Sequence, residues 1–169
     1  MSIFNRSPKN KNQKDNVYGE LRRQVLNLTP GDVEGSSEFP VYAAIVDMDM
    51  GRAVATLACV ADGTTSLYYS TGGGLIGMGQ RYEKVRKATL MFLTQATQVL
   101  PSLTKTTEFP LPTEGKHFAY LLTEQGVYTQ EIDPNKTDPS SKEAYLLFAL
   151  SQFVLTTMRE TDEMQNARK

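Results

Sequence analysis

The sequence has little of the material from which disulfides, membrane spans and charge-driven interfaces are made. Its 169 residues include one cysteine, Cys59, which excludes an internal disulfide, and no tryptophan. Eighteen basic side chains against 19 acidic ones give a net charge of −1, so no overall attraction for nucleic acid or an anionic membrane is expected. No apolar run approaches the roughly 20 residues that span a bilayer. With no apolar leader at the N-terminus, we expect a cytoplasmic protein without a membrane partner.

Composition divides the chain into a basic arm and one domain. Residues 1–16 hold Arg6 and three lysines among polar residues and have almost nothing apolar to bury, which predicts a disordered arm. We favour a solubilising role for this arm over a contact with nucleic acid or lipid. Residues 17–163 are predicted to form a single α+β domain, and residues 164–169 a frayed tail.

Apolar spacing predicts the first half of the domain. Val17, Leu21, Val25 and Leu28 recur at helical spacing, with Arg22 among the residues assigned to the other faces. The run 41–48 is apolar on both of its alternating faces, as in a strand at the centre of a sheet. Asp62-Gly63 separates two further apolar runs and predicts a β-hairpin with a type I′ turn.

The second half is predicted to contain two long helices separated by strands. One helix begins near Tyr82 and ends near Pro101, and a proline-interrupted edge strand at 106–112 and a hairpin of 117–122 with 127–132 follow. A capping box at Ser140 opens the last helix, whose apolar residues cover more than half of its circumference. Either other elements of the fold cover this helix on two sides, or part of it meets another protein chain. The candidate interface residues are Tyr145, Leu146, Ala149 and Phe153.

The order of these elements describes an antiparallel sheet of five or six strands with helices packed on it, in the order helix, three strands, helix, two or three strands, helix. This topology resembles the roadblock, profilin and PAS group of small domains, although roadblock domains have two strands before the middle helix. Separately, the segments 61–74, 75–77, 109–112 and 120–123 resemble an uncharacterised bacterial family of similar length. Both resemblances imply a fold and a bacterial cytoplasmic setting, and neither implies a catalytic residue.

A glycine-rich segment between the predicted third strand and the middle helix is a candidate anion site. Its spacing matches the dinucleotide fingerprint, but the parallel βαβ unit and the acidic residue that this fingerprint requires are missing. Backbone N–H groups at a helix start, together with nearby basic residues, can nevertheless bind a phosphate or carboxylate. The alternative is that the glycines only allow a tight turn, and we favour it. The candidate residues are Gly72, Gly73, Gly74, Gly77, Gly79, Arg81 and Lys84.

Other reactive side chains form no complete site in the sequence. The segment 47–51 resembles the start of a calcium loop but lacks the later ligands, so a polar hairpin end is favoured. Cys59 and His117 could form a dyad only if the fold brought them together, and a buried inert thiol is the commoner outcome. We therefore expect no cofactor, and we favour a non-enzymatic interaction or regulatory domain that forms a homo-oligomer or binds a protein partner. The alternative is a domain that binds a small anion or nucleotide phosphate.

Overall fold

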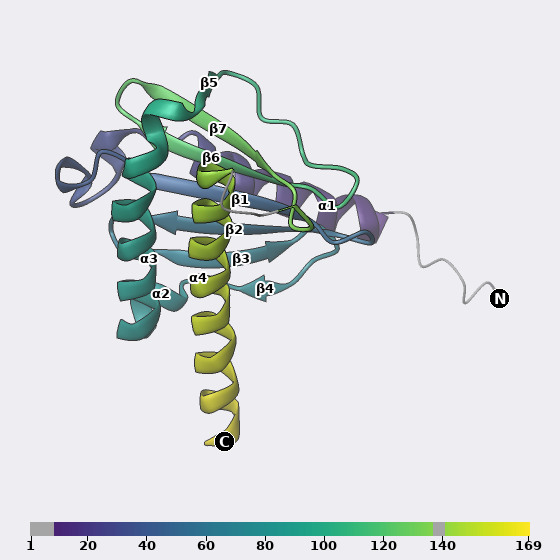
Figure 1. The fold of residues 1–169 in the computed structure, drawn as a ribbon. Coiled ribbons are helices and arrows are strands. Elements are labelled where there is room, and N and C mark those ends of the chain that lie inside the picture. The colour runs from purple at the N-terminus through teal and green to yellow at the C-terminus, as the bar shows by residue number, and fades with distance from the viewer. Residues whose placement is uncertain (1–8, 137–140) are drawn as a thin grey trace.

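The chain folds around one seven-stranded antiparallel sheet, seen in a computed structural model that describes residues 9–136 and 141–169 (Figure 1). The fold class is α+β, as predicted, with one or two strands more than expected. The elements in chain order are α1 (Lys9–Leu26), β1 (Ala43–Asp49), β2 (Val54–Val60), β3 (Thr65–Tyr69), β4 (Gly74–Leu75), α2 (Met78–Arg81), α3 (Glu83–Ala96), β5 (Thr104–Thr106), β6 (His117–Thr123), β7 (Gly126–Ile132) and α4 (Lys142–Ala167). Short 3-10 helices cover Pro30–Asp32, Ser36–Glu38 and Thr97–Ser102.

Strand β1 lies in the middle of the sheet, whose order is β4-β3-β2-β1-β6-β7-β5. It pairs antiparallel with β2 on one side and with β6 on the other, which confirms the prediction of a central strand for the run 41–48. A strand paired on both edges and covered on both faces needs apolar residues at successive positions. Six of its seven residues are buried.

Helices cover the sheet on both faces. Helix α1 lies on one face, and α3 and α4 lie side by side on the other (Figure 1). The register shows which residues belong to each face: Asp47 of β1 is paired with Thr56 of β2 and Phe118 of β6, so these three point toward α1. Cys59, three residues after Thr56 in β2, points to the opposite face and contacts Thr89 of α3.

The hairpin between β2 and β3 forms as predicted, but its turn differs from the expected type I′. Gly63 has a φ of 95°, and Asp62 is not among the residues with positive φ, whereas a type I′ turn needs positive φ at both central residues. The N–H of Gly63 donates to the Val60 carbonyl, and the N–H of Val60 donates to the Thr64 carbonyl. The loop therefore has three residues, with the glycine in the third position.

Several element boundaries differ from those predicted. Helix α1 begins at Lys9 rather than Val17, so residues 9–16 of the expected disordered arm are helical, while residues 1–8 lie outside the described part. Helix α4 extends to Ala167, through residues expected to fray, and its N-cap is Ser141; the predicted cap, Ser140, is not among the described residues. Edge strand β5 ends at Thr106, where the prediction placed its beginning. The hairpin of β6 and β7 is confirmed within one residue at each end.

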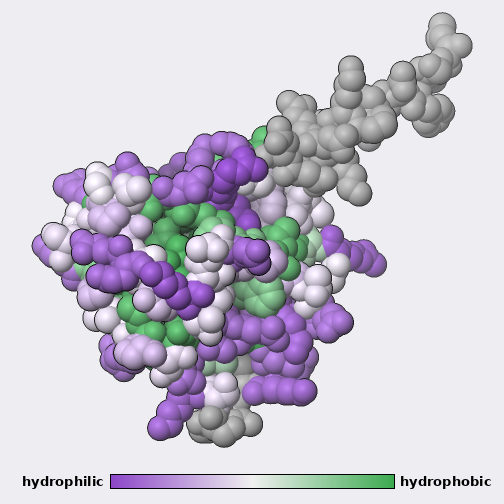
Figure 2. Space-filling view, turned by 90° about the horizontal axis from the view of Figure 1, so that it is seen from above, coloured by the Kyte–Doolittle hydropathy of each residue, from purple (hydrophilic) through white to green (hydrophobic). Residues whose placement is uncertain are grey.

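None of the helices in residues 9–136 and 141–169 combines the length and the apolar character needed to cross a bilayer. Seen from above, the surface shows hydrophobic patches set among hydrophilic side chains (Figure 2).

Candidate functional site

A charged pair is buried between α1 and the centre of the sheet. The side chain of Asp47 is fully buried in β1, and Arg22 reaches it from α1. Nε and Nη2 of Arg22 both donate to Oδ2 of Asp47, at 3.0 and 2.8 Å, and Nη2 also donates to the Phe109 carbonyl at 2.9 Å. Oδ1 of Asp47 accepts a 2.6 Å hydrogen bond from Thr56, whose hydroxyl also bonds Tyr18. Each oxygen of the buried carboxylate therefore has a donor.

The cost of burying these charges explains why the network is so complete. Burial raises the pKa of the Asp47 carboxyl, and the hydrogen bonds and positive charge of Arg22 oppose that rise. Burial also disfavours the Arg22 cation, but the hydrogen bond and charge of Asp47 outweigh it and raise the pKa of Arg22. The guanidinium also lies 5.8 Å from the ring centre of Tyr120, whose pKa burial raises to about 12. The arginine therefore stays charged.

Residues 107–113 form an extended segment, here called the strap, that lies beside α1 over the same sheet face (Figure 1). Two carbonyls hold it: Phe109 accepts from Arg22, and Pro110 accepts a 2.6 Å hydrogen bond from Tyr120. Successive side chains of the strap point to alternate sides, as in an extended chain. Phe109 and Leu111 line the hollow next to α1, whereas Glu108 and Pro110 line a smaller hollow over β6 and β7.

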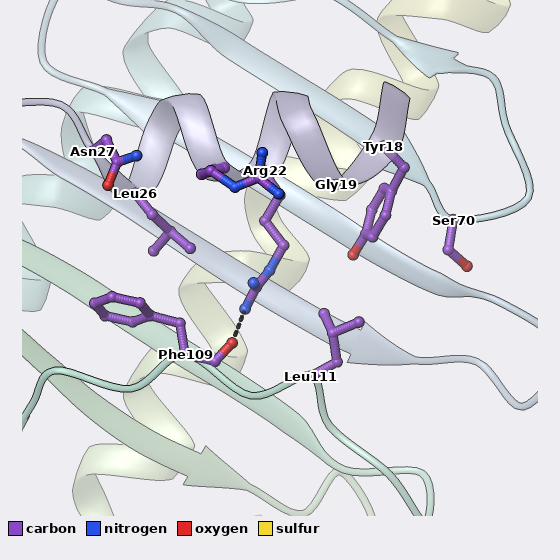
Figure 3. A pocket seen from close by; sticks show the side chains of 9 residues that line it. Tyr18, Gly19, Arg22, Leu26, Asn27, Ser70, Phe109 and Leu111 are labelled. Atoms are coloured by element: carbon purple, nitrogen blue, oxygen red, sulfur yellow. Dashed lines mark hydrogen bonds between the residues drawn. The ribbon is translucent and has the colours of Figure 1, made fainter. Parts of the chain in front are cut away.

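The hollow between α1 and the strap is a pocket of about 600 Å³ (Figure 3). Figure 3 shows the Arg22 side chain lying between the helix and the strap, with Leu26, Phe109 and Leu111 around it. The sequence did not predict this pocket. It placed Arg22 away from the apolar face of the first helix, and this is wrong because Arg22 bonds Asp47 inside the fold. Asp47 was expected both in the central strand 41–48 and in a polar hairpin end at 47–51; it lies in β1, and the hairpin turn begins after Asp49. The available signal was an acidic residue inside an otherwise apolar strand.

The glycine-rich segment has structural explanations for several of its glycines. Gly72 and Gly73 have positive φ in the turn from β3, and Gly77 has a φ of 67° at the N-cap of α2. A Cβ on Gly74 would collide with the Leu67 carbonyl in β3, and one on Gly79 would collide with the Gly63 carbonyl. Both close approaches require glycine.

The proposed anion donors of this segment are partly used inside the fold. The N–H of Gly72 donates to the Tyr69 carbonyl and that of Gly77 to the Ser66 hydroxyl. Strand β4 and the four-residue α2 separate the glycines from α3, which begins with the acidic Glu83. Arg81 and Lys84 are exposed on α2 and α3. Anion binding here stays a prediction, without a preformed cradle of N–H groups to support it.

The four candidate interface residues occupy the outer side of α4. Tyr145 and Phe153 expose 48% and 49% of their surface, Ala149 between them is exposed, and Leu146 is half-buried beside them. The opposite side of the helix, from Ala144 to Met158, is buried against the rest of the fold. The first half of the helix lies over the sheet and its C-terminal half projects beyond it (Figure 1).

Cys59 and His117 do not form a dyad. Cys59 is paired with Ala44 and His117 with Met48, so they lie on opposite sides of β1 and about 13 Å apart along it. Cys59 is fully buried, and burial raises its pKa to about 12, which makes the thiol unreactive. No group of three metal-ligating side chains occurs in the described part of the chain. In the segment 47–51, Asp49 bonds the N–H groups of Gly51 and Gly115.

His117 is buried against Phe148 of α4, and its Nδ1 has no hydrogen-bond partner among the described residues. Burial lowers the pKa of His117 below its ordinary 6.5, although the charge of Asp49 opposes the shift. The folded state therefore favours the neutral ring, and the free energy of unfolding should be highest above pH 6.5 and fall as the pH drops below it. Urea unfolding at about pH 7.5 and about pH 5 measures this difference. His117→Leu should reduce it, and an unchanged difference in that variant would contradict this assignment.

In comparisons with known proteins, no family model, no curated protein and no solved structure matches the chain. What is established is the class: an α+β domain with helices on both faces of an antiparallel sheet. The resemblances inferred from the sequence stay predictions.

Proposed function

We propose that this chain is a non-enzymatic interaction domain that forms a homodimer by antiparallel pairing of α4. The observation that supports it most is the exposed row of Tyr145, Ala149 and Phe153 on a helix whose other side is buried. Residues four positions apart lie on one helix face, so these three form a continuous stripe. A contiguous exposed apolar stripe is more typical of a protein–protein contact than single exposed apolar side chains are.

The order of residues along the stripe favours a second copy of the same chain as the partner. A small residue stands in the middle, with one aromatic residue a turn before it and another a turn after it. If two copies of α4 cross antiparallel at Ala149, the two alanines permit a close approach, and Tyr145 of each copy meets Phe153 of the other. Such a self-complementary arrangement is what a twofold dimer interface requires.

Charges at the ends of the stripe fit the same arrangement. Lys142 would lie opposite Thr156 of the second copy and within about one turn of its Glu160. Antiparallel crossing also places the N-terminal end of each helix nearer the C-terminal half of the other, which is the favourable orientation of the two helix dipoles. The proposal also includes the bacterial cytoplasmic setting and the structural resemblance to roadblock or profilin domains that the sequence suggests.

Cysteine crosslinking tests the position of the proposed twofold axis. Ala149→Cys should give a covalent dimer under mild oxidation, because the two introduced thiols face each other at the crossing. Cys59 is buried and does not interfere. Glu160→Cys is the matched control: eleven residues from the axis, its two copies would lie about 33 Å apart and should not crosslink. Equal crosslinking of both variants, or of neither, would overturn the antiparallel arrangement.

Sedimentation velocity tests whether the stripe drives association. Phe153→Asp should weaken the dimer at least tenfold, because it places a charge in the apolar contact with Tyr145 of the other copy. Val17→Asp is the control, since Val17 is similarly exposed, at 55%, but belongs to α1 on the other sheet face. A monomeric wild-type chain at high concentration would refute the proposal.

A further inference from the structure

The pocket between α1 and the strap lies on the sheet face opposite α4, and the proposed dimer does not use it (Figures 1 and 3). Its volume of about 600 Å³ is within the range of small-molecule sites in proteins, about 300–1,000 Å³. Helix α1, the strap and Ser70, which follows β3, all contribute to it. The lining residues that matter here are Tyr18, Arg22, Arg23, Leu26, Phe109 and Leu111.

The charged side chains that line the pocket are arginines. Two of its nine residues are arginines and none is acidic. The carboxylate that partly neutralises Arg22 belongs to Asp47, which is fully buried beneath it. Arg23 pairs with Glu20 on the exposed surface of α1, at a site where such a pair contributes little. Each arginine is therefore paired with a carboxylate, and neither Asp47 nor Glu20 is among the residues that line the pocket.

Arg22 presents unused donors in a fixed position. Its Nε and Nη2 are occupied by Asp47 and by the Phe109 carbonyl, and Nη1 makes no hydrogen bond to another described residue. The side chain is only 12% exposed. Nη1 is not fully buried, so a ligand in the pocket can reach it. Because the sheet and the strap hold the guanidinium in place, an acceptor that reaches Nη1 would bind with little loss of side-chain entropy.

The walls around this donor are apolar. Leu26 of α1 and Phe109 and Leu111 of the strap lie around the Arg22 side chain, with the ring of Tyr18 at the far end (Figure 3). Apolar walls with one fixed polar group are typical of a site that binds an apolar body and orients it by a single polar head. Charge complementarity makes that head an anion.

We propose that this pocket binds a small monocarboxylate with an apolar body, whose carboxylate accepts hydrogen bonds from Nη1 of Arg22. A carboxylate can accept a charge-assisted hydrogen bond from Nη1 alone and carries a single charge. A phosphate dianion fits less well, because Asp47 offsets part of the Arg22 charge and the walls offer it few donors. The proposal is independent of the dimer, so either can fail without the other.

Calorimetric titration of the full-length wild-type chain with three probes tests the ligand class. Octanoate has an apolar chain and an anionic head. 1-Octanol has the same chain length with a neutral head, and inorganic phosphate is an anion without a chain. We expect octanoate to bind at least tenfold more tightly than either of the others. Octanol binding as tightly as octanoate would show an apolar site without anion recognition, and tighter phosphate binding would show an inorganic anion site; either result overturns the proposal.

A pair of variants at the pocket mouth tests the location. Leu111 is 42% exposed, so a polar replacement is tolerated there. Leu111→Glu should weaken octanoate binding at least tenfold, because it places a negative charge beside the ligand head. Leu111→Gln introduces a side chain of nearly the same shape as glutamate but without the charge, and its affinity for octanoate should stay within about threefold of the wild-type value. In the wild-type chain, the NMR resonance of the Arg22 Nε–H should shift on addition of octanoate. Equal effects of the two variants, or an unmoved Arg22 resonance, would overturn the assignment.

Discussion

Arg22→Met is expected to lower the free energy of unfolding by about 3–5 kcal/mol, because it leaves the Asp47 carboxylate buried without its cation. Asp47 is fully buried in the central strand, so water cannot replace the lost donors without opening the fold. The variant also removes the hydrogen bond to the Phe109 carbonyl, which holds the strap. Urea denaturation at a fixed protein concentration measures the loss, since dimerisation would make the midpoint depend on concentration.

The neighbouring Arg23 supplies a matched control. Arg23→Met removes an ion pair with Glu20 whose two side chains are 63% and 55% exposed, and it should change stability by less than about 0.5 kcal/mol. The double variant Arg22→Met with Asp47→Leu should be more stable than Arg22→Met alone, because an apolar pair of similar volume carries no uncompensated charge. If Arg22→Met behaved like Arg23→Met, the buried pair would have no structural role.

The sequence was most informative where local chemistry decides the structure. Asp62-Gly63 predicted a hairpin, and the apolar face from Val85 to Val99 predicted a helix, because turn residues and periodicity act over a few positions. The structure has both, with the helix continuing from Ala96 as a 3-10 turn. The central position of β1 followed from its two apolar faces.

The buried pair shows where the same reasoning fails. Periodicity assigns charged residues to solvent, so it puts Arg22 away from the apolar face and Val17 on that face. In the structure, the buried side of α1 carries Tyr18 and Arg22, and Val17 is exposed. Burial of these polar groups is stable only because Arg22 of α1 bonds Asp47 of β1, 25 positions away in the sequence. No local sequence pattern predicts a contact at that separation.

The candidate sites were predicted unevenly for the same reason. The four α4 residues lie on one side of the helix, as their spacing predicts. Helical periodicity alone fixes this arrangement, without information about the rest of the fold. The glycine-rich segment was expected to pass from β3 straight into the long helix. In the structure β4 and α2 intervene, because Gly74 and Gly79 permit close backbone contacts that sequence spacing does not reveal. Helix length was underestimated at the end of α4, where Glu, Met, Gln and Ala are good helix formers.

Gly79→Ala is expected to destabilise the fold by about 1–3 kcal/mol, the usual cost of forcing extra volume into a packed site. Gly79 is buried in α2, and its new Cβ would overlap the Gly63 carbonyl and the Thr65 hydroxyl. That hydroxyl bonds both the Gly63 carbonyl, at 3.0 Å, and Thr89 of α3, at 2.5 Å. The strain would therefore spread from the turn between β2 and β3 to the contact between β3 and α3.

Gly19→Ala is the control, because Gly19 is also helical but a Cβ there would meet nothing within 4 Å. It should stabilise the chain by up to about 1 kcal/mol, since alanine is the better helix former. Cys59 provides a second measurement: its Sγ packs against Thr89, so loosening of α3 in Gly79→Ala should speed its labelling by a thiol reagent under native conditions. Slow labelling together with wild-type stability would show that α2 can move away from the turn without disturbing α3, and that the close approach at Gly79 is dispensable.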